Sequence, residues 1–266
     1  MIYLKTEEEI ELLRKANLLV SATLAEIAKH VKPGVSTLEL DTLAEQFIRD
    51  HGAIPTFKGF PASFPGTPPF PASLCTSVNE CVVHGVPTSE PLREGDIVSI
   101  DCGTYLEGFC GDSAYTFCVG EVSEEKRKLL RATKDSLYKA IDMAIPGRRI
   151  GDIGYTVQSH CEAQGYGIVR EFVGHGVGRE MHEEPAVPNY GRAGTGKQLK
   201  NGMCIAIEPM ITLGSPEIGL LSDGWSIITR DRSAAAHFEH SIAIHNGKAD
   251  ILSSFEEIER IEGLLY

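Results

Sequence analysis

The chain has 266 residues, of which 42% are hydrophobic and 23% charged, so it can bury a core in one large domain or two small ones. Its formal net charge is -12, from 37 acidic and 25 basic residues, which argues against a specific nucleic-acid partner because phosphate binding needs clustered Lys and Arg. No run of about 18 apolar residues could span a bilayer, and the acidic start lacks a signal-peptide core, so we expect a cytoplasmic protein with no membrane partner.

The first half of the chain predicts two helices followed by strands. Thr6 is expected to cap a helix, because glutamates fill the first turn and apolar residues then recur with a 3.6-residue period. A second helix is expected from about Thr37 to His51, after the break at Pro33-Gly34. A loop rich in Pro and Gly is expected at 59–71, followed by strands at 74–83 and 96–101. A hairpin is expected to join 97–102 to 113–119.

The second half repeats this order, which indicates an internal duplication. Leu92–Asp101 (LREGDIVSID) aligns with Leu199–Glu208 (LKNGMCIAIE), and each is a turn with Gly followed by a strand that ends in a carboxylate. The helices are expected at 123–144 and 150–164, and the strands at 168–174, 203–213, 225–229 and 234–245. Chance similarity of amphipathic segments is the alternative, but it would not explain the matching carboxylates.

These elements predict an α+β fold in a single domain over residues 1–266. Its halves, about 1–120 and 121–250, would be related by a pseudo-twofold axis, and curved antiparallel strands would be backed by helices. Because no linker separates the halves, we expect one fused unit.

Four carboxylates lie among apolar strand residues, namely Asp101, Asp112, Glu208 and Glu239. A carboxylate inside a sheet is costly unless it is paired or binds a cation. Four salt bridges would each need a buried Arg or Lys, so bound metal explains the set more economically. Asp101 and Asp112 are 11 residues apart, a separation that a hairpin can place on adjacent strands.

His175 is the candidate nitrogen ligand. It lies between Gly174 and Gly176, which let the backbone come close and leave the imidazole uncrowded, although a lone His is more often satisfied locally. One nitrogen and many oxygens favour Mn(II), Fe(II) or Co(II) over structural zinc, and bridging carboxylates suggest two ions about 3.5–4 Å apart that share an activated water. The seven cysteines are odd in number and contain no C-x-x-C pair, so we expect reduced, mostly buried thiols.

Several segments resemble the type 1 methionine aminopeptidases, a family with the pita-bread fold. The matching segments are Phe172–Tyr190 (FVGHGVGREMHEEPAVPNY), Cys75–Glu80 with His84-Gly85, the Asp101/Asp112 pair, Ile207–Pro209 and Phe238–His240. The resemblance covers the chain from Lys5 to about Ile251. It implies removal of the initiator methionine from nascent proteins by dinuclear-metal-assisted hydrolysis of the first peptide bond, with a preference for small second residues.

The resemblance also implies roles for the metal ligands. Asp101 would chelate one metal, and Asp112 and Glu239 would bridge both. His175 and Glu208 would complete the shell of the other metal. Glu208 would in addition shuttle a proton to the metal-bound nucleophile.

Contacts with the substrate follow from the same resemblance. His182 would donate a hydrogen bond to the scissile carbonyl or the developing oxyanion, and His84 would contact the peptide beside the scissile bond. The residues that would wall an apolar pocket for the methionine side chain are Cys75, Trp225, and Phe60 or Phe70. Simple core packing for Trp225 and an ordinary buried thiol for Cys75 are the alternatives.

The chain departs from the family pattern between Gly59 and Cys75, where several extra residues lie around Ala62–Pro69. One interpretation is a tolerated surface insertion. The other is a loop that overhangs the pocket and alters access for the second residue of the substrate. The second interpretation predicts that shortening Ala62–Pro68 leaves metal binding intact but changes kcat/KM among Met-Xaa peptides.

Other functions are open. An Xaa-Pro aminopeptidase or prolidase shares the fold and the five ligands, but those enzymes usually carry a large N-terminal domain, for which Asp101 falls too early. A non-catalytic peptide-binding module of this fold would typically lack metal ligands, whereas all five are present. Only 25 residues separate His182 from Glu208, too few for the helical insertion of type 2 methionine aminopeptidases.

The fold would bury its core within one chain, so we expect a monomer with at most a transient ribosome contact.

Overall fold

The computed structural model describes residues 1–62 and 66–263, and its long helices form where the sequence predicts them. Helix α1 (Glu7–Ala28) begins after Thr6, whose side chain accepts a hydrogen bond from the Glu9 N–H while the Glu9 carboxylate accepts one from the Thr6 N–H. This capping box satisfies N–H groups that have no partner inside the helix. The other helices are α2 (Thr37–Asp50), α3 (Glu124–Asp142), α4 (Ile150–Glu162) and α5 (Glu256–Glu262). The last was not predicted.

The strands fall into one large sheet and two small ones. Their bounds are β1 (Ile54–Pro55), β2 (Leu74–Val78), β3 (Cys81–Val83), β4 (Ile97–Leu106), β5 (Phe109–Cys118), β6 (Gly167–Ile168), β7 (Gly174–Gly176), β8 (Glu183–Val187), β9 (Cys204–Ile207), β10 (Met210–Thr212), β11 (Ile218–Leu220), β12 (Ile227–Thr229), β13 (Ala235–His237), β14 (Glu239–His245) and β15 (Lys248–Ile251). Within the described residues, the large sheet has the order β1-β4-β5-β14-β9-β7-β8, with β2 added at β4 and β15 at β14. The small sheets have the orders β13-β10-β6 and β11-β12-β3.

Several strands that the sequence predicts as continuous are broken. The expected strand 203–213 is two strands, β9 and β10, and 234–245 is likewise β13 and β14. At each break the chain passes from one sheet to another. Strands β9 and β14 pair in the large sheet, whereas β10 and β13 pair in a small one. Expected strand 168–174 is wrong except at its two ends, and 74–83 is interrupted at Asn79, whose φ is 49°.

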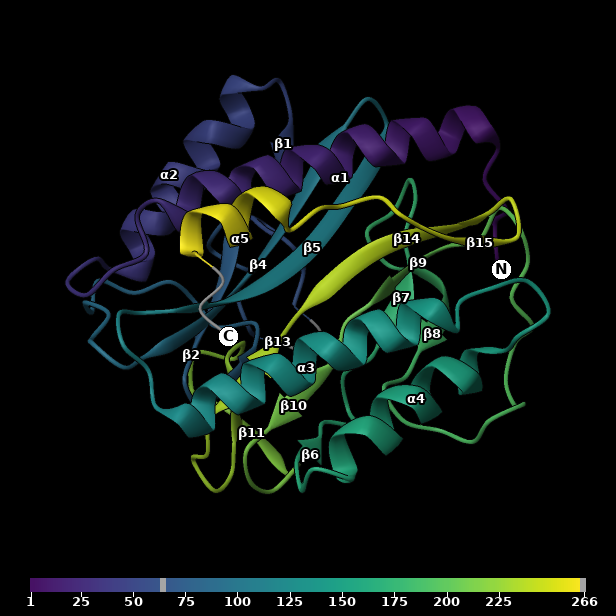
Figure 1. Ribbon diagram of the computed structural model, residues 1–266. Coiled ribbons are helices and arrows are strands. Elements are labelled where there is room, and N and C mark those ends of the chain that lie inside the picture. The colour runs from purple at the N-terminus through teal and green to yellow at the C-terminus, as the bar shows by residue number, and fades with distance from the viewer. Residues whose placement is uncertain (63–65, 264–266) are drawn as a thin grey trace.

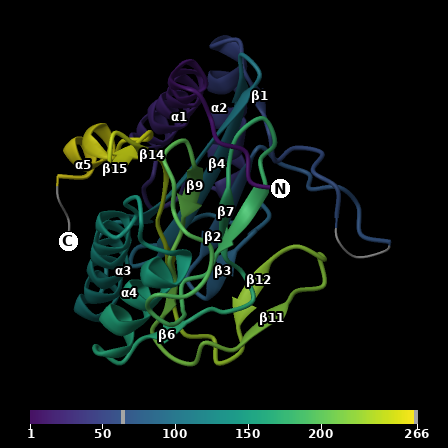
Figure 2. The same cartoon turned by 90° about the vertical axis from the view of Figure 1, so that its right-hand side faces the viewer.

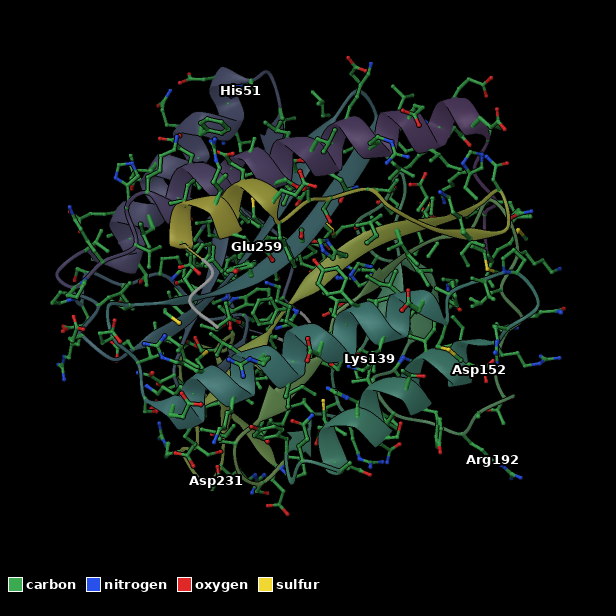
Figure 3. The ribbon with its side chains drawn as sticks, viewed as in Figure 1. His51, Lys139, Asp152, Arg192, Asp231 and Glu259 are labelled. Carbon is green, nitrogen blue, oxygen red and sulfur yellow. The ribbon has the colours of Figure 1, made fainter. Side chains whose placement is uncertain are left out.

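The predicted layering of antiparallel strands backed by helices is confirmed. Helix α1 packs on β4 and β5, and α3 packs on α4 and on strands of the second half (Figure 1). Figure 2 shows α3, α4 and α5 on one side of the sheet, and the loop after β1 and the β11–β12 hairpin on the other. The helices turn charged side chains outward, as Lys139 on α3 illustrates (Figure 3). None of the helices in the described residues combines the length and apolar character needed to cross a bilayer.

Apolar side chains from both halves form one main core between the helices and the sheet. Fully buried members include Leu24 on α1, Phe117 on β5, Ile153 on α4 and Phe238 between β13 and β14. All seven cysteines lie in the described part of the chain as buried free thiols, as expected. The four carboxylates line a cavity together with residues of the loop after β1 and of the β11–β12 hairpin, the segments that Figure 2 shows across the sheet from α3, α4 and α5.

Candidate metal centre and substrate pocket

The β4–β5 hairpin brings Asp101 and Asp112 to one face of the sheet. Asp112 lies opposite Gly103, and Asp101 lies opposite Ala114. The two carboxylates are therefore diagonal neighbours, because residues two apart on a strand share a face. The hairpin spacing predicts this arrangement.

The other ligand candidates come from the second half of the chain. Glu208 follows β9 directly, and Glu239 begins β14, where it pairs with Ala114 on β5. His175 lies on β7, which packs closely on its neighbours: a Cβ on Gly174 would lie 2.3 Å from the carbonyl oxygen of Ala206. Only glycine permits that approach, so Gly174 sets the distance of His175 from β9.

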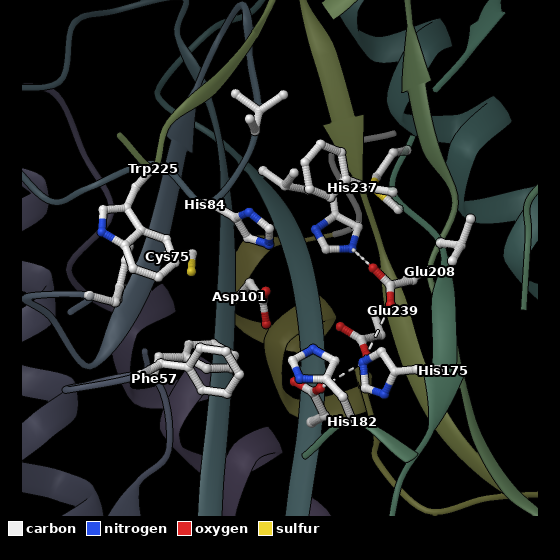
Figure 4. A pocket seen from close by; sticks show the side chains of 18 of the residues that line it. Phe57, Cys75, His84, Asp101, His175, His182, Glu208, Trp225, His237 and Glu239 are labelled. Carbon is white, nitrogen blue, oxygen red and sulfur yellow. Dashed lines mark ion pairs between the residues drawn. The ribbon is translucent and has the colours of Figure 1, made fainter. Parts of the chain in front are cut away.

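The side chains of these residues converge. One donor atom each from Asp112, His175 and Glu239 lies within 4.8 Å of the others. The Nε2 atom of His175 is 3.5 Å from Oδ2 of Asp112 and 3.6 Å from Oε1 of Glu208 (Figure 4). These separations are too long for hydrogen bonds but fit donors that share a cation with bonds of about 2.1 Å. Asp101 lines the same cavity.

The donor set fits divalent metal ions. Three carboxylate oxygens, Asp101 Oδ1, Asp112 Oδ1 and Glu239 Oε1, are buried and have no hydrogen-bond partner in residues 1–62 and 66–263. In the same residues, no Lys or Arg forms an ion pair with any of the four carboxylates. The basic side chains within 4 Å of Asp112 and Glu208 are histidines. Buried carboxylates without such partners are stable only if they are protonated or bind a cation.

Burial shifts the acidity of every group in the cluster. It raises the pKa of Asp101 to about 7 and that of Glu208 to about 8. Burial and, after it, the neighbouring carboxylates also raise the pKa of Asp112 and of Glu239 well above its ordinary value. The pKa of His175 is lowered to about 4, mainly by burial. A cation would therefore displace protons from oxygens and meet a neutral imidazole, the form that binds metals.

The four carboxylates and a larger set of apolar side chains line one cavity of about 430 Å³ (Figure 4). Its lining includes the four pocket-wall residues named from the sequence, Cys75, Phe60, Phe70 and Trp225. Phe70 and Trp225 meet edge to face, with ring centroids 5.1 Å apart. Phe57 also lines the cavity and was missed, because it lies in a loop without periodicity.

The lining places Trp225 at the cavity instead of in the main core. Cys75 also faces the cavity as a buried thiol, and burial raises its pKa well above the ordinary value. It is therefore a small apolar surface and not a thiolate.

The two histidines that the sequence predicts to contact the substrate, His84 and His182, line the cavity. His182 lies beside His175, with ring centroids 4.3 Å apart, and its other neighbour is the edge of Phe60 at 5.4 Å. His84 has φ 57°, an uncommon backbone conformation that is typical of functional positions. Figure 4 shows Asp101 between these two histidines.

His237 is a cavity residue that the sequence analysis missed. It lies two residues before Glu239 across the β13–β14 break, and Figure 4 shows it facing Glu208. The alternation of side chains along a strand could have indicated it, since residues two apart point to the same face.

Known proteins resemble this chain over nearly its whole length. The model of metallopeptidase family M24 matches residues 11–246. The methionine aminopeptidase of Clostridium acetobutylicum is 48% identical over 257 residues, which cover 96% of this chain and 100% of that protein. The crystal structure of methionine aminopeptidase from Rickettsia prowazekii superposes with a TM-score of 0.92 at 41% identity, over 96% of this chain and 100% of that one. A prolidase from Pyrococcus furiosus has a TM-score of 0.73 at 24% identity, over 95% of this chain and 66% of that one, a likeness of fold alone.

Proposed function

This chain belongs to metallopeptidase family M24, and on that premise we propose that it removes the N-terminal methionine from newly made proteins. The fold that the sequence resemblance implies, an α+β pita-bread fold, is that of the matching methionine aminopeptidase structure. The observation that carries the proposal is the convergence of His175 with buried, unpaired carboxylates beside an apolar cavity.

The proposed ligands of two divalent ions are Asp101, Asp112, His175, Glu208 and Glu239. Their oxygen-rich composition suits Fe(II), Mn(II) or Co(II). When bound, such ions polarise the scissile carbonyl and activate water for attack on it.

The remaining chemistry belongs to side chains of the cavity. Glu208 would accept a proton from water and release it to the leaving amine. His182 would donate a hydrogen bond to the carbonyl oxygen as negative charge develops there. His84, which lies across Asp101 from His182, would orient the peptide beside the scissile bond.

The shape and lining of the cavity support selectivity for methionine. Phe60, Phe70, Cys75 and Trp225 offer aromatic and thiol surface, which packs well against an unbranched thioether. We propose that small second residues are preferred, because Phe60 lies against His182 and narrows the space next to the scissile bond.

The cellular setting is part of the same proposal. Nascent chains that begin with methionine would be met in the cytoplasm by a monomer whose 266 residues form one catalytic domain. Any ribosome contact would be transient, and the net charge of -12 disfavours contact through RNA.

The test is cleavage of the tripeptide Met-Ala-Ser, combined with elemental analysis of the purified protein. Loaded with Co(II) or Mn(II), the wild type should release methionine. Asp112→Asn and Glu239→Gln should lose metal and at least about 100-fold in kcat/KM. Asp142→Asn, which removes an exposed carboxylate at the end of α3, is the matched control and should behave as wild type.

Two results would favour the other functions. Cleavage of Ala-Pro in preference to Met-Ala-Ser would indicate a prolidase. A metal-loaded protein that binds Met-Ala-Ser and never cleaves it would indicate a peptide-binding module.

A further inference from the structure

His237 presents an unsatisfied nitrogen to the metal centre. Its side chain is 2% exposed and lines the cavity, and its Nε2 atom has no hydrogen-bond partner among the residues that the structure describes. A buried polar atom without a partner destabilises the folded state, because it gives up its hydrogen bond to water and gains none in return. Such an atom in a cavity wall is typical of a functional group that forms a hydrogen bond to a neighbouring side chain or a ligand when the site is occupied.

The neighbour of this nitrogen is Glu208. The Nε2 atom of His237 is 3.6 Å from Oε2 of Glu208, while Nε2 of His175 is 3.6 Å from Oε1 of the same carboxylate (Figure 4). The two oxygens of Glu208 therefore face two different histidines. Oε1 lies on the side of the proposed metal ligands, and Oε2 lies on the side of His237.

Strand register explains why His237 and Glu208 meet. His237 is opposite Met210 in the β10–β13 pair, and His240 is opposite Ile207 in the β9–β14 pair. One register thus continues through both strand breaks, which places Glu208 opposite Glu239 and His237 one diagonal step away on the same face.

The backbone of His237 is firmly held. The hydroxyl of Thr116 on β5 accepts a hydrogen bond from the His237 N–H at 3.0 Å and donates one to the His237 carbonyl at 2.7 Å. The imidazole therefore projects from a fixed support, as positioning of a catalytic carboxylate requires.

The geometry points to His237 as a positioning residue that donates a hydrogen bond from Nε2–H to Oε2 of Glu208. The Nε2 atom of His237 faces Oε2 of Glu208, whereas Nε2 of His175 faces Oε1. His237 is thus placed to hold Glu208 by the oxygen that does not face the proposed ligand His175. This inference rests on the proposed function, because Glu208 is the proton carrier there.

The separation of 3.6 Å is longer than a hydrogen bond. Catalytic hydrogen bonds are often long before substrate binds and shorten in the complex. A small rotation of the Glu208 carboxylate about its side-chain bonds would close the gap. The proton stays on His237, and the second lone pair of Oε2 remains open to accept a proton from water.

Three substitutions of His237 separate the donor from the shape of the side chain. His237→Gln keeps an N–H near the position of Nε2, whereas His237→Asn places its N–H near Nδ1, out of reach of Glu208. His237→Leu has no donor. We expect the Leu and Asn variants to lose about 10–100-fold in kcat on Met-Ala-Ser and in Co(II) affinity, with KM changed by less than about threefold. The Gln variant should recover to within about threefold of wild type in both.

A double-mutant cycle on Co(II) affinity, measured by calorimetry and by the visible absorption of bound Co(II), tests the route through Glu208. In the Glu208→Ala background, His237→Leu should cause no further loss. A further loss of equal size would show that His237 acts on the metal directly and would overturn the inference. So would a His237→Leu variant equal to wild type, or a His237→Gln variant as impaired as His237→Leu. A wild type that fails to cleave Met-Ala-Ser would contradict the proposed function, while the Co(II) cycle would still decide the role of His237.

Discussion

His182 differs from the proposed ligands in the atoms that surround it. Its imidazole lies between the ring of His175 and the edge of Phe60, at the border between the carboxylates and the apolar wall. Burial lowers its pKa, so at neutral pH the ring is uncharged and can donate only from its N–H. A donor in this place can act on the substrate carbonyl without taking part in metal binding.

We expect His182→Ala to keep its metal and to lose about 10²–10³-fold in kcat, the usual cost of removing one oxyanion donor. The measurement is kcat on Met-Ala-Ser, with bound Co(II) counted by elemental analysis in the same sample. His51→Ala, which removes an exposed histidine after α2, is the control. Loss of metal from His182→Ala would instead make His182 a ligand.

Individual residues differ in how far the sequence predicts them. The four carboxylates could be picked out because each interrupts an apolar strand, where an unpaired charge is costly. The pocket wall could be named only from the family resemblance, since Phe60 and Phe70 lie in a loop whose course has no local periodicity. His237 shares a face with Glu239 by strand alternation, but only the folded structure shows that it meets Glu208.

At the scale of elements, the bounds of α2, α3 and α4 were predicted within one or two residues, whereas α5 and several strand bounds were not. The capping residues Thr6 and Ser123 start their helices at the expected places, because a cap acts on its own backbone. Strand breaks depend on distant partners. The apolar run 203–213 continues through Pro209, and only pairing with β14 and then β13 divides it into two strands.

The loop after β1 is the element whose effect on the substrate is best tested. The prediction that residues Ala62–Pro69 form an insertion falls partly on 63–65, which lie outside the described residues. The two described ends of the loop run together, since Phe70 donates its N–H to the Phe60 carbonyl at 2.9 Å. Pro68 accepts a hydrogen bond from the Trp225 indole at 3.0 Å, so the loop is tied to the pocket wall.

Deletion of residues 62–66, which spares Pro68, should leave Co(II) binding unchanged and alter kcat/KM unevenly among Met-Xaa peptides. The reason is that Phe60 and Pro61 line the cavity and would shift when the loop is shortened. The measurement is a profile over peptides with Xaa from Gly to Leu. Trp225→Phe, which keeps an aromatic ring but removes the N–H to Pro68, should reproduce the direction of the change. An unchanged profile in both would mean that the loop is a tolerated surface insertion.

At the scale of the whole molecule, we expect the proposed metal centre to couple folding to pH. The site draws its carboxylates from both halves of the chain, with Asp101 and Asp112 on one hairpin and Glu208 and Glu239 on strands of the second half. Without metal, the folded chain must hold these groups close together as acids. Folding and protonation are then linked, because each group binds its proton more tightly in the folded chain than in the unfolded one.

The direction of the effect follows from the pKa values. A carboxyl group whose pKa is raised by folding contributes less stability as pH rises from its ordinary value near 4 through the folded one, which is about 7 for Asp101 and about 8 for Glu208. Buried histidines act in the opposite direction, but only below their ordinary pKa of about 6.5, since burial lowers the pKa of His84 and His175 to about 4. Between about pH 6.5 and 8.5 the carboxylates therefore determine how the stability contributed by this site changes with pH.

We expect the metal-free protein to lose stability from pH 6.5 to 8.5, and the stabilisation by added Mn(II) to grow over the same range. Metal replaces the protons on the carboxylates, so the loaded protein has fewer protons to lose as pH rises. The measurement is the free energy of unfolding in urea at both pH values, with EDTA and with excess Mn(II). The buried thiols are common to both forms and cancel in the difference between them. A stabilisation by Mn(II) that stayed constant or shrank with rising pH would mean that the carboxylates are ionised in the metal-free fold, which the absence of any paired Lys or Arg in the described residues makes costly.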